Sequence, residues 1–432
     1  MNRILQILFW SVISAAFIGP GTITTAASSG TKFGFNLLWA LIFSTIACLT
    51  LQEAGARITV VSGSDLGQAI QKQFSNSKYR IFVFFLVIGA IILGCAAYEA
   101  GNILGSVAGA SLNLNISPKI ITIAIVAIAG LMLYFGTIKT IAHILGVVVA
   151  LMGVTFLVTA ISIRPSIISI IKGSFIPSIP QGSEILVLAL VGTTVVPYNL
   201  FLGSGIAKGQ SIGELRFGLS IAVIFGGIIS MGVLVVGTSI NGVFSFENLS
   251  NSLSNSLGNW AGVFFSIGLF SAGFSSALTA PLAASITARS LFEKGAVNKW
   301  EEKSWNFRLI WGLVLLSGLI FGLIRIKPIP AIIFAQALNG LLLPFISIFL
   351  FILVNDVNLM GPDRINGKIS NLIMFVVVVS TIILGISNFT KAISKIFGLT
   401  IGNEKILLNI SVIFAFLLVV SILIIIIKKR KV

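Results

Sequence analysis

Apolar stretches long enough to cross a membrane recur from one end of this chain to the other. Hydrophobic residues make up 56% of the 432 residues, and charged residues make up only 9%. A helix of about 20 apolar residues spans the hydrocarbon core of a bilayer, and the sequence contains about twelve such stretches. We therefore predict an all-α polytopic membrane protein with spans at roughly 9–30, 37–61, 80–110, 118–136, 140–163, 183–208, 214–240, 260–292, 305–326, 329–354, 371–388 and 406–427.

The net charge of +16 comes from 28 Lys and Arg against 12 Asp and Glu. In a soluble protein this excess would indicate nucleic acid binding, but in membrane proteins basic residues gather in cytoplasmic loops. With the N-terminus inside, most basic residues fall in such loops. We therefore expect a multi-pass plasma-membrane protein with both termini cytoplasmic and no nucleic acid partner. The basic run Lys428–Lys431 follows the last span and is interpreted as a topology anchor; a nuclear signal and a patch for anionic lipid are the alternatives.

Two of the spans are interrupted near their centres by a proline. The first interruption is Gly19–Thr22 and the second is Val195–Asn199. In lipid, a broken helix is tolerated only where it is buried in protein or lines a cavity. Breaks at matching points of two halves indicate the substrate site of a transporter, although each proline could instead only kink its helix.

The order of the spans predicts an internal repeat within a single transmembrane domain, residues 1–432. Two sets of five spans, 9–163 and 183–354, each begin with a broken segment, which is typical of an inverted repeat. Residues 355–432 then form two additional C-terminal helices. In the third span, Gly101, Gly105 and Gly109 repeat every four residues, so one face of this helix can approach a neighbour closely.

Several motifs of the chain resemble the Nramp (SLC11) family of transporters. They are Gly19–Thr22, Leu37–Leu41, Leu51–Glu53, Ala56–Arg57, Ser62–Leu66, Gly192–Leu202, Ala335–Gln336, Leu343–Phe345 and Met360–Gly361. The resemblance covers roughly residues 9–362. It implies the LeuT-type fold with a 5+5 inverted repeat and about twelve transmembrane helices, of which helices 1 and 6 are broken. It also implies alternating access and secondary transport.

The chain departs from that family at the residues that bind the metal. Typical members hold a divalent transition metal between an Asp and an Asn of the first break and a Met that precedes the second proline. The matching positions here are Gly19, Thr22 and Val196, so neither a carboxylate nor a thioether remains. A dehydrated dication needs such ligands to offset its loss of water, although magnesium is less demanding because it can keep its waters. We therefore predict no transition-metal site.

The two breaks instead suggest an anion site. After each break a half-helix begins with free N–H groups and the positive end of its dipole, near Thr22–Ile23 and Tyr198–Asn199. Threonine and tyrosine hydroxyls can donate to oxygens, although any single threonine can instead bond back to its own helix. The residues predicted to bind the substrate are Gly19, Pro20, Gly21, Thr22, Thr193, Thr194, Val196, Pro197, Tyr198, Asn199 and Gln336.

The same resemblance identifies a candidate coupling pathway. Family members carry an Asp and a Glu on the third helix and two histidines on the sixth; the matching positions are Glu99 and Asn102, and Tyr198 and Gly203. An ionisable side chain at membrane depth indicates function, so Glu99 with Asn102 is the predicted proton or coupling pathway. The alternative is a neutral, hydrogen-bonded Glu99.

The leading hypothesis is therefore secondary active transport of a small inorganic anion such as bicarbonate, coupled to protons or sodium. One alternative is a divalent metal cation transporter for Mn²⁺, Mg²⁺ or Fe²⁺ that uses carbonyl groups and a hydrated ion, and another is a membrane sensor that does not transport. The sequence contains no phosphate-binding loop, zinc-spaced Cys/His set or Ser-His-Asp constellation, so we expect neither an enzyme nor a cofactor. The expected partners are a small inorganic ion and the lipid bilayer, without an obligatory protein partner.

Overall fold

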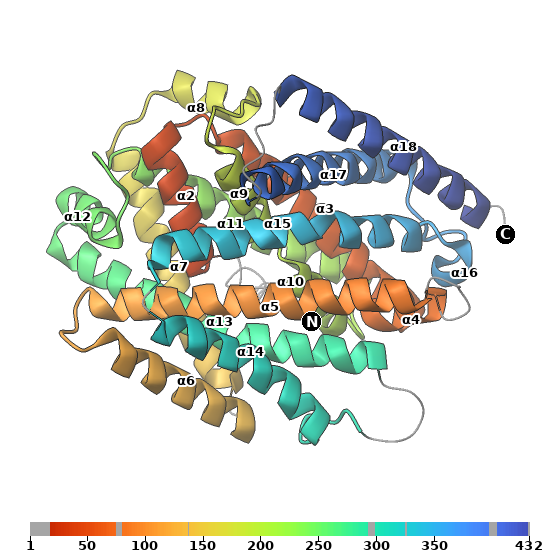
Figure 1. Cartoon of the computed structure of the whole chain (residues 1–432), viewed down its shortest axis with the longest axis horizontal. Coiled ribbons are helices and arrows are strands. Elements are labelled where there is room, and N and C mark those ends of the chain that lie inside the picture. Colours follow the sequence, from red (N-terminus) through yellow and green to blue (C-terminus); the bar gives the residue numbers. More distant parts are fainter. Residues whose placement is uncertain are drawn as a thin grey trace.

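The computed structural model describes residues 18–74, 80–136, 138–292, 299–324, 326–396 and 404–430, and within these ranges every regular element is a helix. Figure 1 shows them as one bundle. In chain order they are α2 (Pro20–Phe33), α3 (Leu38–Ser62), α4 (Leu66–Phe74), α5 (Arg80–Ser111), α6 (Pro118–Phe135), α7 (Ile138–Ser162), α8 (Ile167–Phe175), α9 (Glu184–Thr194), α10 (Pro197–Ile206), α11 (Ile212–Gly237), α12 (Phe246–Leu257), α13 (Asn259–Phe292), α14 (Trp305–Leu323), α15 (Pro328–Leu353), α16 (Val357–Met360), α17 (Lys368–Ile396) and α18 (Glu404–Arg430).

The predicted spans agree with the observed helices. Among the described residues, 11 segments are long and apolar enough to cross a membrane. The first predicted span, 9–30, is described from Ile18, and its helix α2 begins at Pro20; residues 9–17 lie outside the described residues. An all-α polytopic membrane protein is thereby confirmed, while the inverted repeat of 9–163 and 183–354 stays a prediction.

The second broken segment lies at the centre of the bundle. Helix α9 ends at Thr194 and α10 begins at Pro197, with Val196 extended between them. In this segment 94% of the most apolar window is buried, against 22% in α14 and 28% in α18. The peripheral helices are therefore exposed on the outside of the bundle, while the interruption is enclosed by protein, as the lack of water in a bilayer requires.

Four short helices were not predicted, because a search for spans passes over segments of this length or polarity. These are α4, α8, α12 and α16. In α12 the hydroxyl of Ser245 accepts from the backbone N–H of Asn248 and caps the helix. Phe246, Leu249 and Leu253 of the same helix are buried on one face. The sequence carried this signal, namely a capping serine followed by apolar residues at helical spacing.

The glycine-rich face of α5 packs against three different helices. A Cβ at Gly105 would lie 2.1 Å from the Cβ of Pro20, where α2 begins. A Cβ at Gly109 would lie 2.5 Å from the backbone nitrogen of Phe270 in α13, whereas Gly101 faces α15. The predicted close approach is confirmed, and at Gly105 it allows the start of the broken helix to rest directly on α5.

We predict that Gly105→Ala displaces α2 and lowers the free energy of unfolding by about 1–3 kcal/mol, the usual cost of overpacking. Its matched control is Gly89→Ala in the same helix, where nothing lies within 4 Å of the added Cβ. That change favours helix by up to about 1 kcal/mol. Melting temperatures of the two purified variants measure the difference, and equal values would show that α2 does not rest on Gly105.

Candidate functional site

The two interruptions meet through a pair of threonine hydroxyls. The Oγ1 atoms of Thr22 in α2 and Thr193 in α9 lie 2.8 Å apart, although 171 residues separate them in sequence. Both side chains are buried. The structure therefore brings together the two breaks that the sequence singled out.

Aromatic residues of α5 and α10 extend this hydroxyl cluster. The rings of Tyr98 and Tyr198 meet edge to face, with centroids 5.3 Å apart. The hydroxyl of Tyr98 faces the side chains of Thr193 and Tyr198. Sequence reasoning missed Tyr98, although it directly precedes Glu99 and is the kind of residue that can carry a hydroxyl into an apolar core. Four helices thus contribute hydroxyl groups to one buried place.

Helix α15 contributes Gln336 to the same place. A Cβ at Gly21 would lie 2.3 Å from the Nε2 atom of Gln336, so the amide rests directly on the first break. The Oε1 atom of Gln336 and both amide atoms of Asn199 are buried, and none of them has a hydrogen-bond partner within the described part of the chain. Each buried polar atom without a partner costs about 1–3 kcal/mol. We therefore expect these atoms to hydrogen-bond to water or to a ligand.

The backbone donors that the sequence predicted are partly used within the chain. The N–H of Ile23 donates to the carbonyl of Gly19 at 3.2 Å, and the N–H of Asn199 donates to the carbonyl of Val196 at 3.0 Å. The expectation that both groups point free toward a ligand was wrong. Each half-helix closes its first turn locally, because a proline at the first helical position leaves the following residues in helical geometry. The hydroxyl of Thr194 likewise donates to the backbone carbonyl of Leu190 at 3.0 Å. This threonine therefore bonds to its own helix, which was the alternative to binding the substrate.

The residues around the breaks carry no formal charge. Gly19, Pro20, Val196 and Pro197 shape the interruptions through their backbone, since each lies just before or at a helix start. In the part of the chain that the structure describes, no group of three or more His, Cys, Asp or Glu side chains could hold a metal ion. The site therefore offers neutral oxygen and nitrogen atoms as possible ligands.

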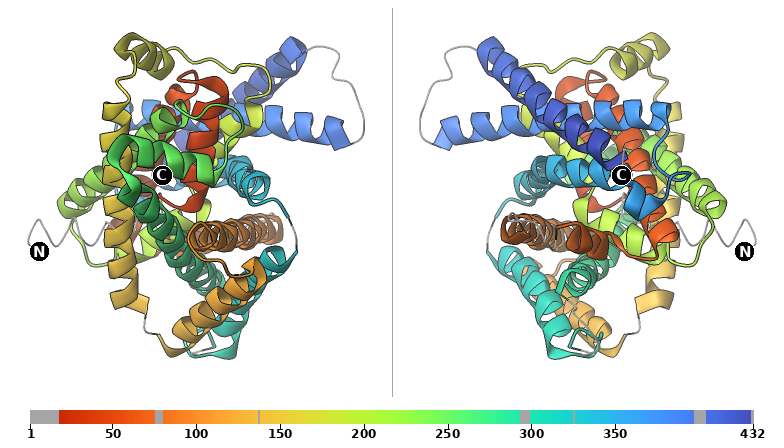
Figure 2. Two further views of the ribbon diagram at one scale, coloured as in Figure 1. Left: turned by 90° about the vertical axis from the view of Figure 1, so that its left-hand side faces the viewer. Right: turned by 90° about the vertical axis from the view of Figure 1, so that its right-hand side faces the viewer.

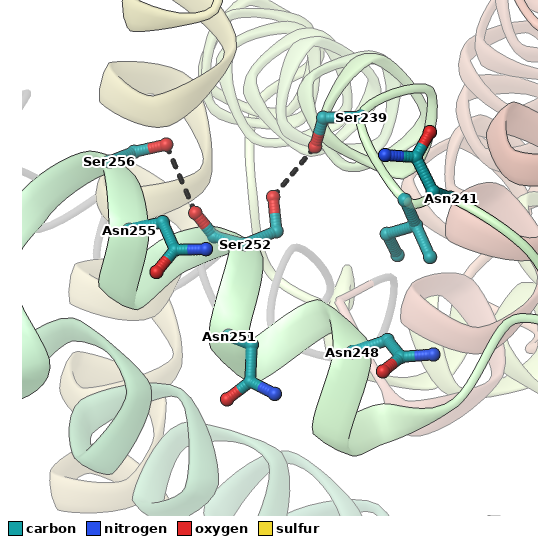
Figure 3. Close-up of a pocket in the computed structure, with 8 residues that line it drawn as sticks. Ser239, Asn241, Asn248, Asn251, Ser252, Asn255 and Ser256 are labelled. Atoms are coloured by element: carbon teal, nitrogen blue, oxygen red, sulfur yellow. Dashed lines mark hydrogen bonds between the residues drawn. The ribbon is translucent and has the colours of Figure 1, made fainter.

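Another polar place lies at the surface beside α12. Figure 3 shows this pocket of about 290 Å³, in which Ser239 and Ser252 share a hydrogen bond of 2.6 Å between their Oγ atoms. Its lining consists of asparagine, serine and isoleucine side chains and includes none of the predicted site residues. The buried site at the breaks thus remains the candidate functional site.

A family model described as "Natural resistance-associated macrophage protein-like" matches residues 11–391 of the chain. The chain belongs to the Nramp family. The resemblance identified from its motifs is thereby confirmed.

Curated relatives align with part of this Nramp-family chain. "Natural resistance-associated macrophage protein 2" of Mus musculus is 28% identical over 213 residues, which is 46% of this chain and 36% of the relative. "Divalent metal cation transporter MntH" of Bacillus subtilis is 26% identical over 255 residues, covering 54% of this chain and 58% of the relative. These matches span between a third and three fifths of the relatives' length.

Solved structures show the fold over nearly the whole chain. A manganese transporter of Eremococcus coleocola, solved with an aromatic bis-isothiourea compound, superposes with a TM-score of 0.71 at 18% identity, covering 99% of this chain and 94% of that one. Mhp1, a nucleobase-cation-symport-1 family transporter, superposes with a TM-score of 0.56 at 13% identity and 98% coverage of this chain. The LeuT-type fold of the Nramp transporters is therefore confirmed.

Glu99 and Asn102 of this Nramp-family chain are in contact on α5. The Nδ2 atom of Asn102 donates to the Oε2 atom of Glu99 at 3.4 Å, and both side chains are buried. The Oε1 atom of Glu99 has no hydrogen-bond partner among the described residues, and Gly318 of α14 packs against the Glu99 side chain. The pair predicted from sequence thus lies together at membrane depth, next to Tyr98. Its role in coupling stays a prediction.

We predict that two glycines beside Gln336 respond differently to alanine. A Cβ at Gly192 would lie 2.0 Å from the backbone oxygen of Gln336, so Gly192→Ala should push α9 from α15 and lower the melting temperature by several degrees. At Gly21 the added Cβ meets the flexible end of Gln336 instead. Gly21→Ala should therefore leave the melting temperature nearly unchanged. Thermal unfolding of the two purified variants measures the difference. A larger decrease in melting temperature for Gly21→Ala than for Gly192→Ala would contradict this packing.

Proposed function

We propose that the ion carried by this Nramp-family secondary transporter is a divalent metal cation that keeps part of its water shell. The observation that carries the proposal is the pair of buried oxygens, Gln336 Oε1 and the side-chain oxygen of Asn199, that have no partner among the described residues. Carbonyl oxygens of this kind are ligands for hard cations such as Mg²⁺ and Mn²⁺, directly or through water.

The relatives support a metal substrate. One is named a divalent metal cation transporter and another a manganese transporter. Their names favour the cation hypothesis over the anion hypothesis that the sequence put first. The local bonding of the Ile23 and Asn199 amides points the same way, since it removes two of the donors on which an anion site was to depend.

The neutral site explains why the cation should stay partly hydrated. Gly19, Thr22 and Val196 offer no charge and no sulfur. Removing all water from a dication costs far more than neutral oxygens can return. Magnesium and manganese, which are held well by oxygen and water, fit this chemistry better than ions that prefer sulfur or imidazole.

A small anion such as bicarbonate is the second candidate function. It is favoured by one observation, the cluster of hydroxyl donors formed by Thr22, Thr193 and Tyr98 without any carboxylate from the two breaks. Hydroxyl donors suit an oxyanion. The absence of a lysine or arginine from the predicted site residues argues against tight anion binding.

Coupling and orientation complete the proposal. We expect Glu99, with Asn102 as its hydrogen-bond donor, to take up or release the coupling proton; sodium is the alternative coupling ion. We also expect the membrane to be the plasma membrane. Both termini should lie in the cytoplasm, since basic residues gather in the loops on that side.

We predict that proteoliposomes containing the purified chain take up radiolabelled manganese with saturation, that magnesium competes, and that Gln336→Ala abolishes most of this uptake. The control is Gln181→Ala, which removes the same amide from an exposed loop. Labelled bicarbonate is tested in parallel. Saturable bicarbonate uptake without manganese or magnesium uptake would overturn the cation proposal in favour of the second candidate.

Neighbouring threonines of α9 provide a further test. Thr193→Ala removes the hydroxyl that contacts Thr22, and we predict a rise of about fivefold in the manganese concentration at half-maximal uptake, because a neutral hydrogen bond contributes about 1 kcal/mol. Thr194→Ala, whose hydroxyl is bonded to its own helix, should leave this concentration unchanged. Concentration series for the two variants measure the difference, and equal half-maximal concentrations in the two variants would contradict the prediction.

A further inference from the structure

The C-terminal basic residues are docked in a buried polar cluster at one end of the bundle. The Nζ atom of Lys429 lies 2.8 Å from the Oδ2 atom of Asp356, whose side chain is 2% exposed. The Nε and Nη2 atoms of Arg430 donate to the Oδ1 atom of Asn355 at 3.0 and 2.6 Å. The sequence interpretation of Lys428–Lys431 as a plain topology anchor does not account for these contacts, because an anchor needs only charge near the membrane surface.

The same cluster reaches α3 through the connection between α15 and α17. Arg430 also donates to the backbone carbonyl of Asn366, and Arg57 of α3 donates to the Oδ1 atom of Asn366. Arg57 further donates to the backbone carbonyl of Arg364 at 2.6 Å. We call this set the C-terminal clasp; its members are Arg57, Asn355, Asp356, Asn366, Lys429 and Arg430.

Two contacts extend the clasp to other helices. Glu53 of α3 pairs with Arg57 at 3.0 Å and with Arg216 of α11 at 2.8 Å. Gln73 of α4, with its amide in the orientation that satisfies both groups, donates to Asp356 at 2.8 Å and accepts from Lys429 at 2.7 Å. Figure 1 shows α4, α16 and the C-terminal end of α18 together at this end of the bundle, and Figure 2 shows the same grouping from the side.

Helices α3, α4 and α10 pack together at the end of the bundle that carries the clasp. Ser204 of α10 is buried there, where its Oγ atom lies 2.6 Å from the Oγ1 atom of Thr59 and accepts from the backbone N–H of Leu66 at 2.7 Å. Helix α10 begins at the second break, and α15, which carries Gln336, ends two residues before Asn355. Elements that form the candidate site therefore run directly into the clasp.

We propose that the C-terminal clasp is an autoinhibitory contact that holds this end of the bundle closed and must release before the end can open. Alternating access requires contacts on the closed side to break. Only 28% of the most apolar window of α18 is buried. Lys429 and Arg430 at its end bind Asp356, Asn355 and Asn366, so the helix end can leave while the bundle stays folded. Once released, Lys429 and Arg430 regain water, whereas Asp356 loses its partner, which favours return.

The test measures how accessible the closed end is. Ser204→Cys places a thiol under the clasp in the full-length chain, whose two native cysteines, Cys48 and Cys95, are buried and set the background. We expect Lys429→Ala/Arg430→Ala to raise the rate of labelling by N-ethylmaleimide at least about tenfold, since the loss of even one hydrogen bond to a charged group shifts an equilibrium by that order. Lys428→Ala removes the same charge from an exposed residue outside the clasp and should leave the rate unchanged.

Equal labelling of the double variant and the Lys428→Ala control would overturn the proposal and leave the tail as an anchor. If the double variant does not elute as one folded species, the same labelling is measured in Arg430→Lys. Lysine keeps the charge but lacks the guanidinium that reaches both Asn355 and Asn366. Labelling of that variant at the parent rate overturns the proposal, and faster labelling supports it. The readout uses no transported ion, so it separates the clasp from the identity of the substrate.

Discussion

The contact between the hydroxyls of Thr22 and Thr193 joins the two places where membrane-spanning backbone is interrupted. Between Thr194 and Pro197 the chain makes no continuous helix, and a bilayer offers no water to the exposed backbone groups. The interruption can persist only because other helices enclose it. Helix α15 packs against α9 just before this interruption, where Gly192 meets the backbone of Gln336, and α5 and α15 enclose the first break through Gly105 against Pro20 and Gln336 against Gly21. The rest of the bundle is arranged around this requirement.

Enclosure of the breaks by neutral polar side chains also shapes what the protein can bind. The hydroxyls of Thr22 and Thr193 contact each other, while the oxygens of Gln336 and Asn199, which have no partner among the described residues, remain as acceptors. A site of this kind cannot neutralise a bare dication, and it has no cationic side chain to hold an anion tightly. An ion that brings its own water satisfies the orphaned oxygens without full dehydration. The same physical argument explains how an Nramp-family site can lose its acidic and sulfur ligands and keep the fold.

The clasp and the candidate site are connected through continuous elements. Helix α15 carries Gln336 toward one end and leads into Asn355 and Asp356 at the other. Helix α10 begins at the second break and ends next to α3 and α4. A movement that separates the ends of these helices therefore also changes the surroundings of the breaks. Coupling between the clasp and the candidate site then needs no pathway beyond the helices themselves, which transmit motion as rigid elements.

The sequence by itself determined the membrane class, the spans, the two breaks and the family, because hydropathy and proline act locally along the chain. It also identified Glu99, Asn102 and Gln336, whose side chains are buried as expected of functional polar residues. It misjudged the amides of Ile23 and Asn199 and missed Tyr98, α12 and the docking of Lys429 and Arg430. These depend on which distant groups come within hydrogen-bonding distance. Local pattern can place a polar residue on a helix, but only the tertiary structure decides whether its partner is its own helix, a remote residue or a ligand.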